Sequence, residues 1–361
     1  MNSLQGTSPL ANRPLRVAIN GYGRIGRCVL RALYETPRLH PHIDIVGINE
    51  PSDLATMAYL TRFDSTHGVF PGTVDELEEG LAVNGRKIVV THATTPEEVD
   101  WGRLEVDMVL ECSGRYDRRV DFERFVRSGC SRLLVSHPGQ SAQDVDFTVV
   151  YGINHEQVPE TASIVSNASC TTNASVPVLA ALHELYGVEH AFLTTLHSVM
   201  NDQPLIDGYH HKDLRRTRSA MQSIVPVSTG LAQGVERLLP QLYGKVQAKA
   251  IRVPILNVSA IDLMLKLGRD IDASELNTTL NALSKASPGL IAYSDHPHAS
   301  VDFNHNPNSV IIDGSQTRTN GDGFANLFLW FDNEWGFANR MLDTVRAWAK
   351  KFHLQEQAEF S

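Results

Sequence analysis

Apolar and polar residues in the first part of the chain follow a strand, helix, strand pattern. Residues 15–20 form a short apolar run with β-branched side chains, which predicts a strand. After it, Ile25, Val29 and Leu33 recur at the spacing of one helical face. Residues 42–49 form a second apolar, strand-like run. The pattern predicts a β-α-β unit with parallel strands.

The same alternation continues to about residue 169. Asn84 and Gly85 stand between two strand-like arms and predict a tight hairpin, because both positions of such a turn need a positive φ. Residues 106–114 read as a buried parallel strand, with Ser113 and Gly114 at the carboxyl edge of the sheet. The other segments are a helix and loop at 52–68, a helix at 120–128, and strands at 132–139 and 147–154. This alternation predicts a doubly wound parallel sheet.

Beyond a helix-like run at 174–187 the pattern changes, because longer strand-like runs follow with few helices between them. These runs lie at 191–198, 248–267, 300–304, 309–317 and 324–331. They predict an α+β domain with a mostly antiparallel sheet. Phe337, Met341, Val345 and Trp348 then share one face of a final helix, which we expect to pack back on the first domain.

Length and composition fit this two-domain organisation. The chain has 361 residues, more than one hydrophobic core usually serves. Its 42% hydrophobic and 20% charged residues are typical of globular proteins. We expect a disordered tail at 1–14, a first domain at 15–169 that the C-terminal helix at 334–361 completes, and a second domain at 170–333.

Charge and cysteine usage argue against several classes of function. A net charge of −9 makes nucleic acid or an anionic membrane an unlikely main partner. No run reaches the roughly 18 apolar residues of a membrane span, and residues 1–14 lack the apolar core of a signal peptide. The four cysteines show neither disulfide density nor metal-ligand spacing, and the histidines lack further ligands at such spacing. We therefore expect reduced thiols, a cytoplasmic protein and no metal.

Gly21, Gly23 and Gly26 form a G-x-G-x-x-G motif between the first strand and the first helix. In dinucleotide-binding units such glycines allow a tight turn, close approach of the backbone to the pyrophosphate, and packing of helix on strand. Glu50 follows the second strand, where a carboxylate binds ribose hydroxyls and repels a 2′-phosphate. A purely structural glycine turn is the alternative, but strand, helix and acidic residue together predict an NAD site.

Residues 166–173, SNASCTTN, lie between a strand-like segment and a helix-like run, with Cys170 near the centre. A thiol at a helix N-terminus is expected to have a lowered pKa, because the helix dipole and free N–H groups favour the thiolate. Pro177 leaves the helix start open. A helix from Cys170 contains the proline, whereas a start near Ala174 weakens the dipole argument. A lone cysteine is most often a small buried hydrophobic residue, so a catalytic role requires a partner base.

His197 ends a predicted strand at the start of the second domain and is the candidate base. A lone histidine after a strand usually makes a structural hydrogen bond. Here, however, it accompanies a candidate nucleophile, Cys170, at the domain junction. A thiol paired with an imidazole is the arrangement that activates cysteine and later moves protons.

Several long motifs occur in order from Leu15 to the C-terminal helix. They are GYGRIG, SNASCTTN, TTLHS, HKDLRRTR, VPVSTG, RVP and DNEWGFANRM. Together they resemble the glyceraldehyde-3-phosphate dehydrogenase superfamily, which implies a Rossmann NAD domain and an α+β catalytic domain. Within the superfamily, the strings VSHPG, HSVMNDQ, SVDFNHNP and FDNEWGFANRM make the chain more similar to the erythrose-4-phosphate dehydrogenases than to the glycolytic enzymes.

The resemblance implies a role for each matching residue. Cys170 would be the nucleophile and His197 its base. The residues that would bind the cofactor are Gly21, Gly23, Arg24, Ile25, Gly26, Glu50, Ser113, Ser136 and Asn333, the last two toward the nicotinamide. The residues that would bind the substrate and its phosphate are Ser169, Thr171, Asp202, Arg216, Thr229, Gly230 and Arg252.

Two positions depart from the family pattern. Ala174 stands where the family commonly has a second cysteine, on which no catalytic step depends. Met200 stands where the glycolytic enzymes offer a threonine hydroxyl to the substrate phosphate, and this change fits a longer sugar phosphate. The expected reaction is NAD-dependent oxidation of D-erythrose 4-phosphate to 4-phosphoerythronate, which feeds pyridoxal phosphate synthesis.

Two alternatives stay open at this point. The first is a phosphorylating glyceraldehyde-3-phosphate dehydrogenase, and the second is a non-enzymatic nucleotide-binding sensor on the same scaffold. The resemblance also implies a homotetramer in which residues 209–227 reach a neighbour's cofactor, which light scattering would test. The expected partners are a small phosphorylated aldose and further copies of the chain, with no nucleic acid or membrane.

Overall fold

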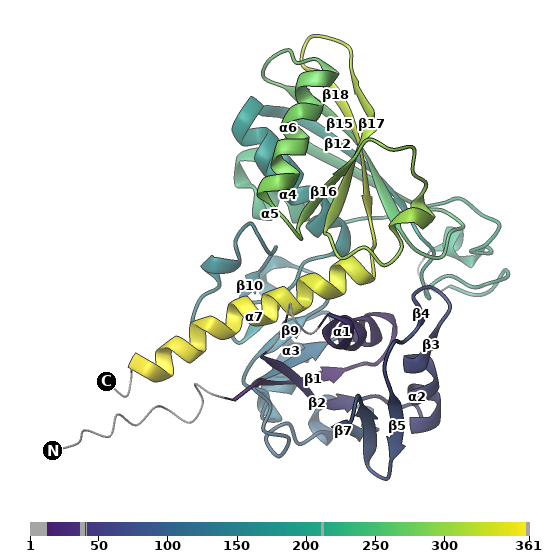
Figure 1. The fold of residues 1–361 in the computed structure, drawn as a ribbon, viewed down its shortest axis with the longest axis vertical. Coiled ribbons are helices and arrows are strands. Elements are labelled where there is room, and N and C mark those ends of the chain that lie inside the picture. The colour runs from purple at the N-terminus through teal and green to yellow at the C-terminus, as the bar shows by residue number, and fades with distance from the viewer. Residues whose placement is uncertain (1–12, 37–39, 41, 211–212, 359–361) are drawn as a thin grey trace. The chain divides into compact units, whose positions relative to one another are not determined.

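The computed structural model describes residues 13–36, 40, 42–210 and 213–358, with side chains described up to Phe352. The chain forms two compact units (Figure 1). The first contains the chain up to Ala168 and the segment from Ala338 onward, and the second spans Ser169–Phe337. Residues 1–12 of the predicted tail, and His211 and Lys212 of the basic segment, lie outside the described residues.

A nine-stranded sheet forms the centre of the first unit among the described residues, in the order β10-β11-β9-β8-β1-β2-β7-β6-β5. Neighbouring strands pair in parallel from β10 to β7, and β6 and β5 continue the sheet antiparallel at one edge. The strands are β1 (Leu15–Asn20), β2 (Ile43–Asn49), β5 (Val74–Leu77), β6 (Gly80–Val83), β7 (Arg86–Thr91), β8 (Met108–Glu111), β9 (Leu133–Val135), β10 (Phe147–Thr148) and β11 (Ile164–Ser166); β3 (Phe63–Asp64) and β4 (Gly68–Val69) form a separate pair.

Helices of the first unit bury their apolar faces against this sheet. Phe122 and Phe125 of α3 are fully buried in a core cluster with residues of β1, β8 and β9. In α7, the Thr344 hydroxyl donates to Asn167 Oδ1 over 2.7 Å, and Met341 and Val345 of the predicted apolar face are fully buried. The helical segments are α1 (Arg24–Glu35), α2 (Leu54–Arg62), η2 (Pro96–Glu98), α3 (Arg119–Arg127), η3 (Ala142–Asp144), η4 (His155–Gln157) and α7 (Trp335–Ala358), the last assigned to this unit from Ala338.

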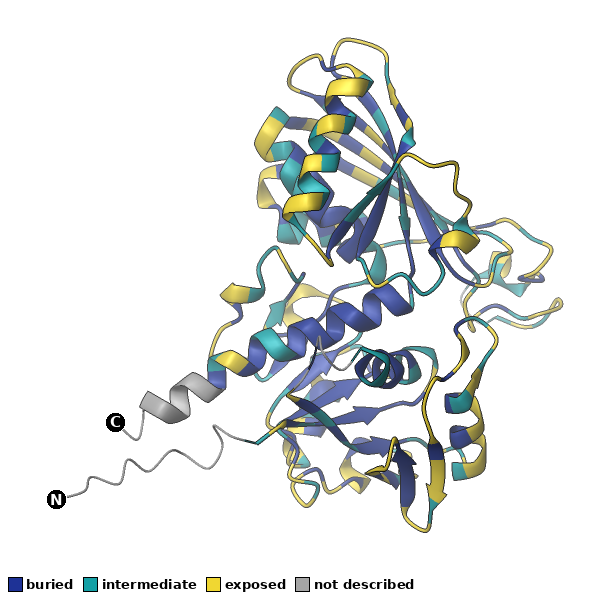
Figure 2. Cartoon of the chain, in the orientation of Figure 1, coloured by how far each residue is buried: buried dark blue, intermediate teal, exposed yellow. Residues whose placement is uncertain are grey.

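The second unit is built on a sheet with the order β13-β14-β12-β15-β18-β17-β16, in which most neighbours are antiparallel. Its helices α4, α5 and α6 lie on one face of the sheet (Figure 1). Along β18 buried residues alternate with more exposed ones, as expected of a sheet covered on one side (Figure 2). The elements are α4 (Cys170–Tyr186), β12 (Val188–His197), η5 (Leu214–Thr217), β13 (Val225–Val227), α5 (Leu231–Leu238), η6 (Pro240–Leu242), β14 (Val246–Arg252), β15 (Ser259–Leu267), α6 (Ala273–Ala286), β16 (Ile291–Ser294), η7 (Ser300–Phe303), β17 (Val310–Thr319) and β18 (Phe324–Phe331).

This architecture confirms the predicted fold class, but two predicted strands are wrong. Residues 300–304 alternate like a strand, yet they form the turn η7, because the Asp302 carboxylate accepts from Ala299 N over 2.8 Å and closes it. Of the predicted strand at 147–154 only β10 forms. Asn154 ends the strand, since its side chain accepts from Val150 N and donates to Thr148 O. Among the described helices, none combines the length and apolarity needed to cross a bilayer.

Candidate active site

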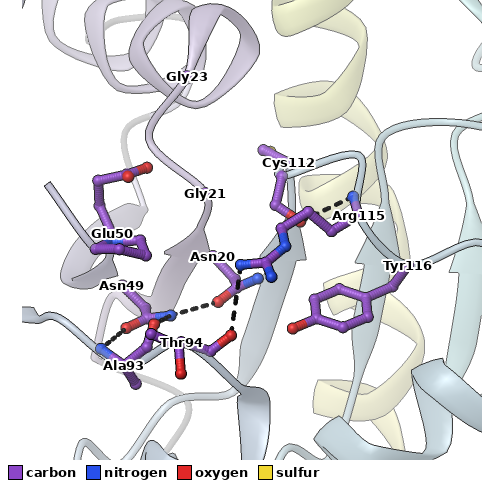
Figure 3. A pocket seen from close by; sticks show the side chains of 12 residues that line it. Asn20, Gly21, Gly23, Asn49, Glu50, Ala93, Thr94, Cys112, Arg115 and Tyr116 are labelled. Atoms are coloured by element: carbon purple, nitrogen blue, oxygen red, sulfur yellow. Dashed lines mark hydrogen bonds between the residues drawn. The ribbon is translucent and has the colours of Figure 1, made fainter. Parts of the chain in front are cut away.

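The glycine motif forms the turn between β1 and α1 and borders a cleft of about 230 Å³ in the first unit (Figure 3). Gly21 has a φ of +86°, and a Cβ there would lie 2.4 Å from Ser113 Cα, so both conformation and space require glycine. A Cβ on Gly26 would lie 2.3 Å from Gly21 O, so this glycine permits close packing of helix on strand. A Cβ on Gly23, by contrast, would meet no atom of the described chain within 4 Å. This glycine leaves room for a ligand.

Glu50 follows β2 and lines the same cleft. Its carboxylate accepts hydrogen bonds from Tyr22 N over 2.8 Å and from Ser52 N over 3.3 Å. These bonds fix the carboxylate beside the glycine turn. Gly23 is the N-cap of α1, whose first N–H groups have no acceptor within the helix. The cleft therefore combines a glycine turn that leads into a helix N-terminus with a fixed carboxylate that can accept hydrogen bonds from hydroxyl groups, and dinucleotides are bound by this combination.

Three polar side chains at the ends of the neighbouring strands β2, β1 and β8 are hydrogen-bonded in a row. Asn49 Nδ2 donates to Asn20 Oδ1 over 2.8 Å, and Asn20 Nδ2 donates to Glu111 Oε2 over 2.5 Å. Ser113 donates to Glu111 Oε1 from its backbone N–H over 2.8 Å and from its hydroxyl. Burial raises the pKa of Glu111 to about 7, although the bonds from Ser113 and Asn20 act to lower it. This row ties together the strand ends that border the cleft.

The remaining predicted cofactor residues lie elsewhere. Of the described residues that line this cleft, none is Arg24, Ile25, Gly26 or Ser136. Arg24, at the start of α1, forms an ion pair of 2.5 Å with Asp64. Ser136 follows β9, and its backbone N–H donates to Glu111 O over 3.0 Å. Asn333 belongs to the second unit.

Cys170 is the first residue of α4 and directly follows the N-cap residue Ser169, whose hydroxyl accepts from Thr172 N over 3.1 Å. The helix therefore contains Pro177, and of the two predicted helix starts the earlier one is correct. Cys170 is partly exposed, whereas the other three cysteines of the chain are buried. As the first residue of the helix, Cys170 has a backbone N–H without an acceptor in the helix.

His197 ends β12 and brings its imidazole to the Cys170 thiol. The distance from Cys170 Sγ to His197 Nε2 is 3.7 Å, although the two residues lie 27 positions apart in the chain. On the other side of the ring, His197 Nδ1 lies 2.8 Å from Ser198 O. Because a carbonyl oxygen can only accept, Nδ1 carries the proton and Nε2 presents its lone pair to the sulfur. The imidazole is thus oriented as a base for the thiol.

Burial dominates the titration of both groups. It raises the pKa of the Cys170 thiol, against the opposing effects of hydrogen bonds with Thr171 and of the positive charge on Arg252. It also lowers the pKa of His197 to about 4, although the bond to Ser198 O raises it. Burial thus raises the pKa of the thiol, where the position at a helix N-terminus led us to expect a lowered pKa. Each shift by itself favours the neutral form of its group in the site without ligand.

Two arginines converge on one carboxylate in the second unit. Arg216 Nη1 lies 2.8 Å from Asp202 Oδ2, and Arg252 Nη1 lies 3.0 Å from Asp202 Oδ1. The structure thus brings these three predicted substrate residues together, and Asp202 leaves further guanidinium donors for an anion. Near Cys170, Thr171 Oγ1 lies 3.8 Å from the sulfur. The remaining pair, Thr229 and Gly230, precedes α5, where Gly230 is the N-cap and Thr229 Oγ1 accepts from Leu231 N.

Two known protein-family domains match the chain, one in each unit. Residues 15–119 match the glyceraldehyde 3-phosphate dehydrogenase NAD binding domain, and residues 169–333 match the glyceraldehyde 3-phosphate dehydrogenase C-terminal domain. The chain belongs to the glyceraldehyde-3-phosphate dehydrogenase superfamily. As a member of this superfamily it is an NAD-dependent dehydrogenase, and NAD is its coenzyme.

Several residues that the structure places beside predicted site residues of this superfamily member were not predicted from the sequence. Asn20, Asn49 and Glu111 were not predicted, although each ends an apolar strand with a polar side chain, which is a readable signal at the ligand-binding edge of a parallel sheet. Ser198 and Ser259, which contact Asn333, were also missed. They carry no sequence signal, because only the pairing of β15 with β18 brings Ser259 close to the end of β18.

Proposed function

We propose that this NAD-dependent dehydrogenase oxidises D-erythrose 4-phosphate to 4-phosphoerythronate. The observation that carries the proposal is the contact of 3.7 Å between the Cys170 thiol and the lone-pair nitrogen of His197, in a superfamily of NAD-dependent dehydrogenases. A thiol with a positioned base is the nucleophile that oxidation of an aldehyde through a thioester requires.

In the first step the Cys170 sulfur attacks the aldehyde carbon. A C–S bond forms, and His197 Nε2 carries the thiol proton to the aldehyde oxygen, which gives a thiohemiacetal. The neutral imidazole is ready for this transfer, because its pKa of about 4 leaves Nε2 unprotonated at neutral pH. The backbone N–H of Cys170, at the helix N-terminus, would donate to the oxygen while negative charge develops on it.

In the second step His197 removes the hydroxyl proton of the thiohemiacetal and the carbon loses a hydride, which leaves a thioester on Cys170. NAD supplies the two-electron acceptor for that hydride, and Gly21, Gly23 and Glu50 would hold it in the first unit. In the third step water attacks the thioester and loses a proton to solvent, the C–S bond breaks, and the sulfur recovers the proton that His197 took in the second step. The net change is oxidation of an aldehyde to an acid, with one hydride transferred.

The two arginines on Asp202 support a phosphorylated substrate. Arg252 is buried and Arg216 is partly exposed, so their guanidinium groups are fixed by Asp202 and still present donors to an anion. Planar guanidinium groups suit the bidentate binding of a phosphate. We assign Ser169, Thr171, Thr229 and Gly230 to a second anion position.

Met200 supports the four-carbon substrate. It is 47% exposed and lies two residues before Asp202, where glycolytic members offer a threonine hydroxyl. A thioether cannot donate a hydrogen bond, so the phosphate of a three-carbon substrate loses a donor here. A second candidate function is the phosphorylating oxidation of glyceraldehyde 3-phosphate, which the names of both matched domains favour.

Turnover of the two aldehydes separates these functions. NADH formation is followed at 340 nm with D-erythrose 4-phosphate or glyceraldehyde 3-phosphate, each with and without inorganic phosphate. We expect kcat/KM to be at least about tenfold higher for erythrose 4-phosphate. We also expect a rate that is independent of phosphate and 4-phosphoerythronate as product, which in a cell would feed pyridoxal phosphate synthesis.

If the protein prefers glyceraldehyde 3-phosphate and forms NADH only when inorganic phosphate is present, the proposal is wrong and the second candidate function is correct. Binding of NAD without oxidation of either aldehyde would reject both, and would indicate the non-enzymatic sensor instead.

A further inference from the structure

Another cavity of the first unit lies at the edge of the sheet opposite the coenzyme cleft. Its walls come from the last turn of α1 and from the starts of β2 and β7, whereas the coenzyme cleft borders the N-terminus of α1 and the far end of β2. Because α1 has 12 residues and is therefore roughly 18 Å long, the two sites are separate. The cavity has a volume of about 220 Å³, and its lining residues include Leu33, Tyr34, His40, Ile43, Asp44 and Arg86.

His40 lines this cavity with an imidazole that makes no hydrogen bond. The residue is 3% exposed, and neither ring nitrogen has a partner among the described residues of the chain. Burial lowers the pKa of His40 to about 4, although the negative charge of Asp343 on α7 acts to raise it. The ring is therefore neutral at neutral pH, with one nitrogen that can donate and one that can accept. Buried polar groups without a partner are rare in folded proteins, and a bound ligand is one way to complete them.

The hydroxyl of Tyr34 is a second such group at the same cavity. Its oxygen is buried, and no residue in the described part of the chain forms a hydrogen bond with it. Burial raises the pKa of Tyr34 to about 12, and the carboxylate of Asp44 adds to this effect while Arg86 opposes it. The hydroxyl is therefore protonated at neutral pH, and it can both donate and accept. Two separate elements thus present uncharged donors and acceptors to one cavity.

The charged groups at the cavity neutralise each other. Arg86 Nη1 lies 2.7 Å from Asp44 Oδ1. An anion in the cavity would face the carboxylate, and a cation would face the guanidinium group. The two groups without partners, His40 and Tyr34, carry no charge that could offset either repulsion. The charges of the lining therefore favour a ligand without a net charge.

Apolar side chains form the rest of the lining that the ligand would contact. Leu33 and Ile43 are 5% and 6% exposed, and they offer apolar surface to the face of a ring. A ligand that is only apolar would pack on them but would leave two buried polar groups without partners. An uncharged planar ring with a donor next to an acceptor satisfies both conditions. The volume of the cavity suits a single small ring, because sites for larger ligands are usually more spacious.

We propose that this cavity is a second ligand site, which binds an uncharged nitrogen heterocycle of the nucleobase type. The polar edge of the ring would pair with Tyr34 and His40, and its faces would pack on Leu33 and Ile43. The proposal goes beyond the proposed function, because it involves neither the aldehyde substrate nor any residue that lines the coenzyme cleft.

Ligand-observed NMR on the full chain tests the proposal. Uracil and adenine are titrated into protein saturated with NAD, so that the coenzyme cleft is already filled. We expect at least one of these bases to bind with a Kd on the order of 10⁻⁴–10⁻³ M, as is typical of so small a ligand. For uracil, 1,3-dimethyluracil is the matched control, because it keeps the ring and lacks both N–H donors. It should bind about three- to tenfold more weakly than uracil.

Two substitutions remove the unpartnered groups one at a time. Tyr34→Phe and His40→Leu should each weaken binding of the base about three- to tenfold. Neither side chain is hydrogen-bonded to a described residue, so neither variant should melt below the wild type when no base is present. Tyr59→Phe is the matched control, since Tyr59 is 59% exposed on α2 and should leave binding of the base unchanged. An unchanged affinity for NAD shows that each variant is folded.

Three results would overturn the proposal. If neither base binds, the cavity holds only solvent. If NAD displaces the base, or inorganic phosphate competes with it, the ligand binds in the coenzyme cleft or the site is an anion site. If Tyr34→Phe and His40→Leu lower the melting temperature and leave the affinity for the base unchanged, the two groups only stabilise the fold. None of these measurements uses aldehyde turnover, so a failure of the proposed function is distinguished from a failure of this proposal.

Discussion

The two candidate sites, the coenzyme cleft of the first unit and the thiol–imidazole pair of the second, are built from different kinds of atoms. In the first unit, the cleft is shaped by backbone at Gly21 and Gly23 and by strand ends, and the key positions fall within one β-α-β segment. In the second unit, the reactive groups are side-chain atoms of Cys170 and His197, which come from α4 and β12. Substitutions that add atoms beside the glycines should therefore reduce coenzyme binding most. Substitutions that remove the thiol or the imidazole should reduce turnover most.

This difference also separates binding from chemistry. A site made of backbone N–H groups recognises charge and shape, and it tolerates changes in side chains that point away from it. A site made of a thiol and an imidazole depends on two particular functional groups, and neither has a substitute among its neighbours. Mutations of Cys170 or His197 are thus expected to abolish turnover while leaving the affinity for NAD intact.

The largest expected effect comes from removing the sulfur. Cys170→Ala should reduce NADH formation by a factor on the order of 10⁴–10⁶, as removal of a catalytic nucleophile does. The affinity for NAD, measured by calorimetry, should stay within about twofold, because the cleft of the first unit is unchanged. Cys130→Ala is the matched control, since Cys130 is buried in the core of the first unit and should leave turnover nearly unchanged. Retained turnover in Cys170→Ala would refute the catalytic role.

The elements of the first unit that depend on local sequence could be predicted from the sequence. The strand at 15–20, the helix after the glycines and the hairpin at Asn84 were predicted close to their observed bounds. The hairpin has φ values of +49° at Asn84 and +77° at Gly85, as its turn type requires. These elements follow from patterns within a few residues, because glycine conformation and apolar periodicity are local properties.

Other elements and residue pairs could not be predicted from local patterns, because they depend on contacts between distant segments. The helices α5 and α6 were not predicted. In α6 only Leu276 and Leu280 are buried, and its asparagines and threonines are poor helix formers. In α5, Gly234 interrupts the pattern because a Cβ there would come within 3.2 Å of Thr172 Oγ1. The pairing of Cys170 with His197 was a hypothesis from chemistry, and the residues around Asp202 came from family resemblance, since no local pattern places them together.

A pair of glycine substitutions sharpens the comparison by adding one methyl group at two neighbouring positions. Gly23→Ala should fold normally, since the new Cβ meets no described atom within 4 Å, but it should occupy space needed by the coenzyme. We expect NAD affinity to fall about 5- to 150-fold, which corresponds to an overpacking cost of about 1–3 kcal/mol. Gly21→Ala should instead lose stability by about 1–3 kcal/mol, because of its positive φ and the contact with Ser113.

Thermal unfolding and calorimetric titration with NAD distinguish the two variants. The comparison predicts a normal melting temperature with weak binding for Gly23→Ala, and a lowered melting temperature for Gly21→Ala. A Gly23→Ala protein that binds NAD as tightly as the wild type would show that the space beside Gly23 is not part of the coenzyme site.

The smallest expected effect concerns a side-chain interaction in the first unit, the ion pair between Arg24 and Asp64. Burial acts to raise the pKa of Asp64, but the bonds from Arg24 and from the backbone of His67 outweigh it and lower the pKa from 3.8 to about 2. A carboxyl group with a depressed pKa stabilises the fold above its unfolded value, and this contribution declines as the pH falls from 3.8 toward 2. Asp64→Asn should therefore cost about 1 kcal/mol at neutral pH, after allowance for solvent around Arg24.

Urea unfolding between pH 7 and pH 3 measures this contribution. The difference in unfolding free energy between wild type and Asp64→Asn should be constant down to about pH 4 and shrink below it, since the carboxyl group of the unfolded wild type then takes up a proton while the folded one stays ionised. Asp44→Asn is the control, because the partner of Asp44, Arg86, is 59% exposed and such surface pairs contribute little. A difference that stays constant through pH 3 would mean that Asp64 stabilises the turn by its shape and its hydrogen bonds, and that its charge contributes nothing.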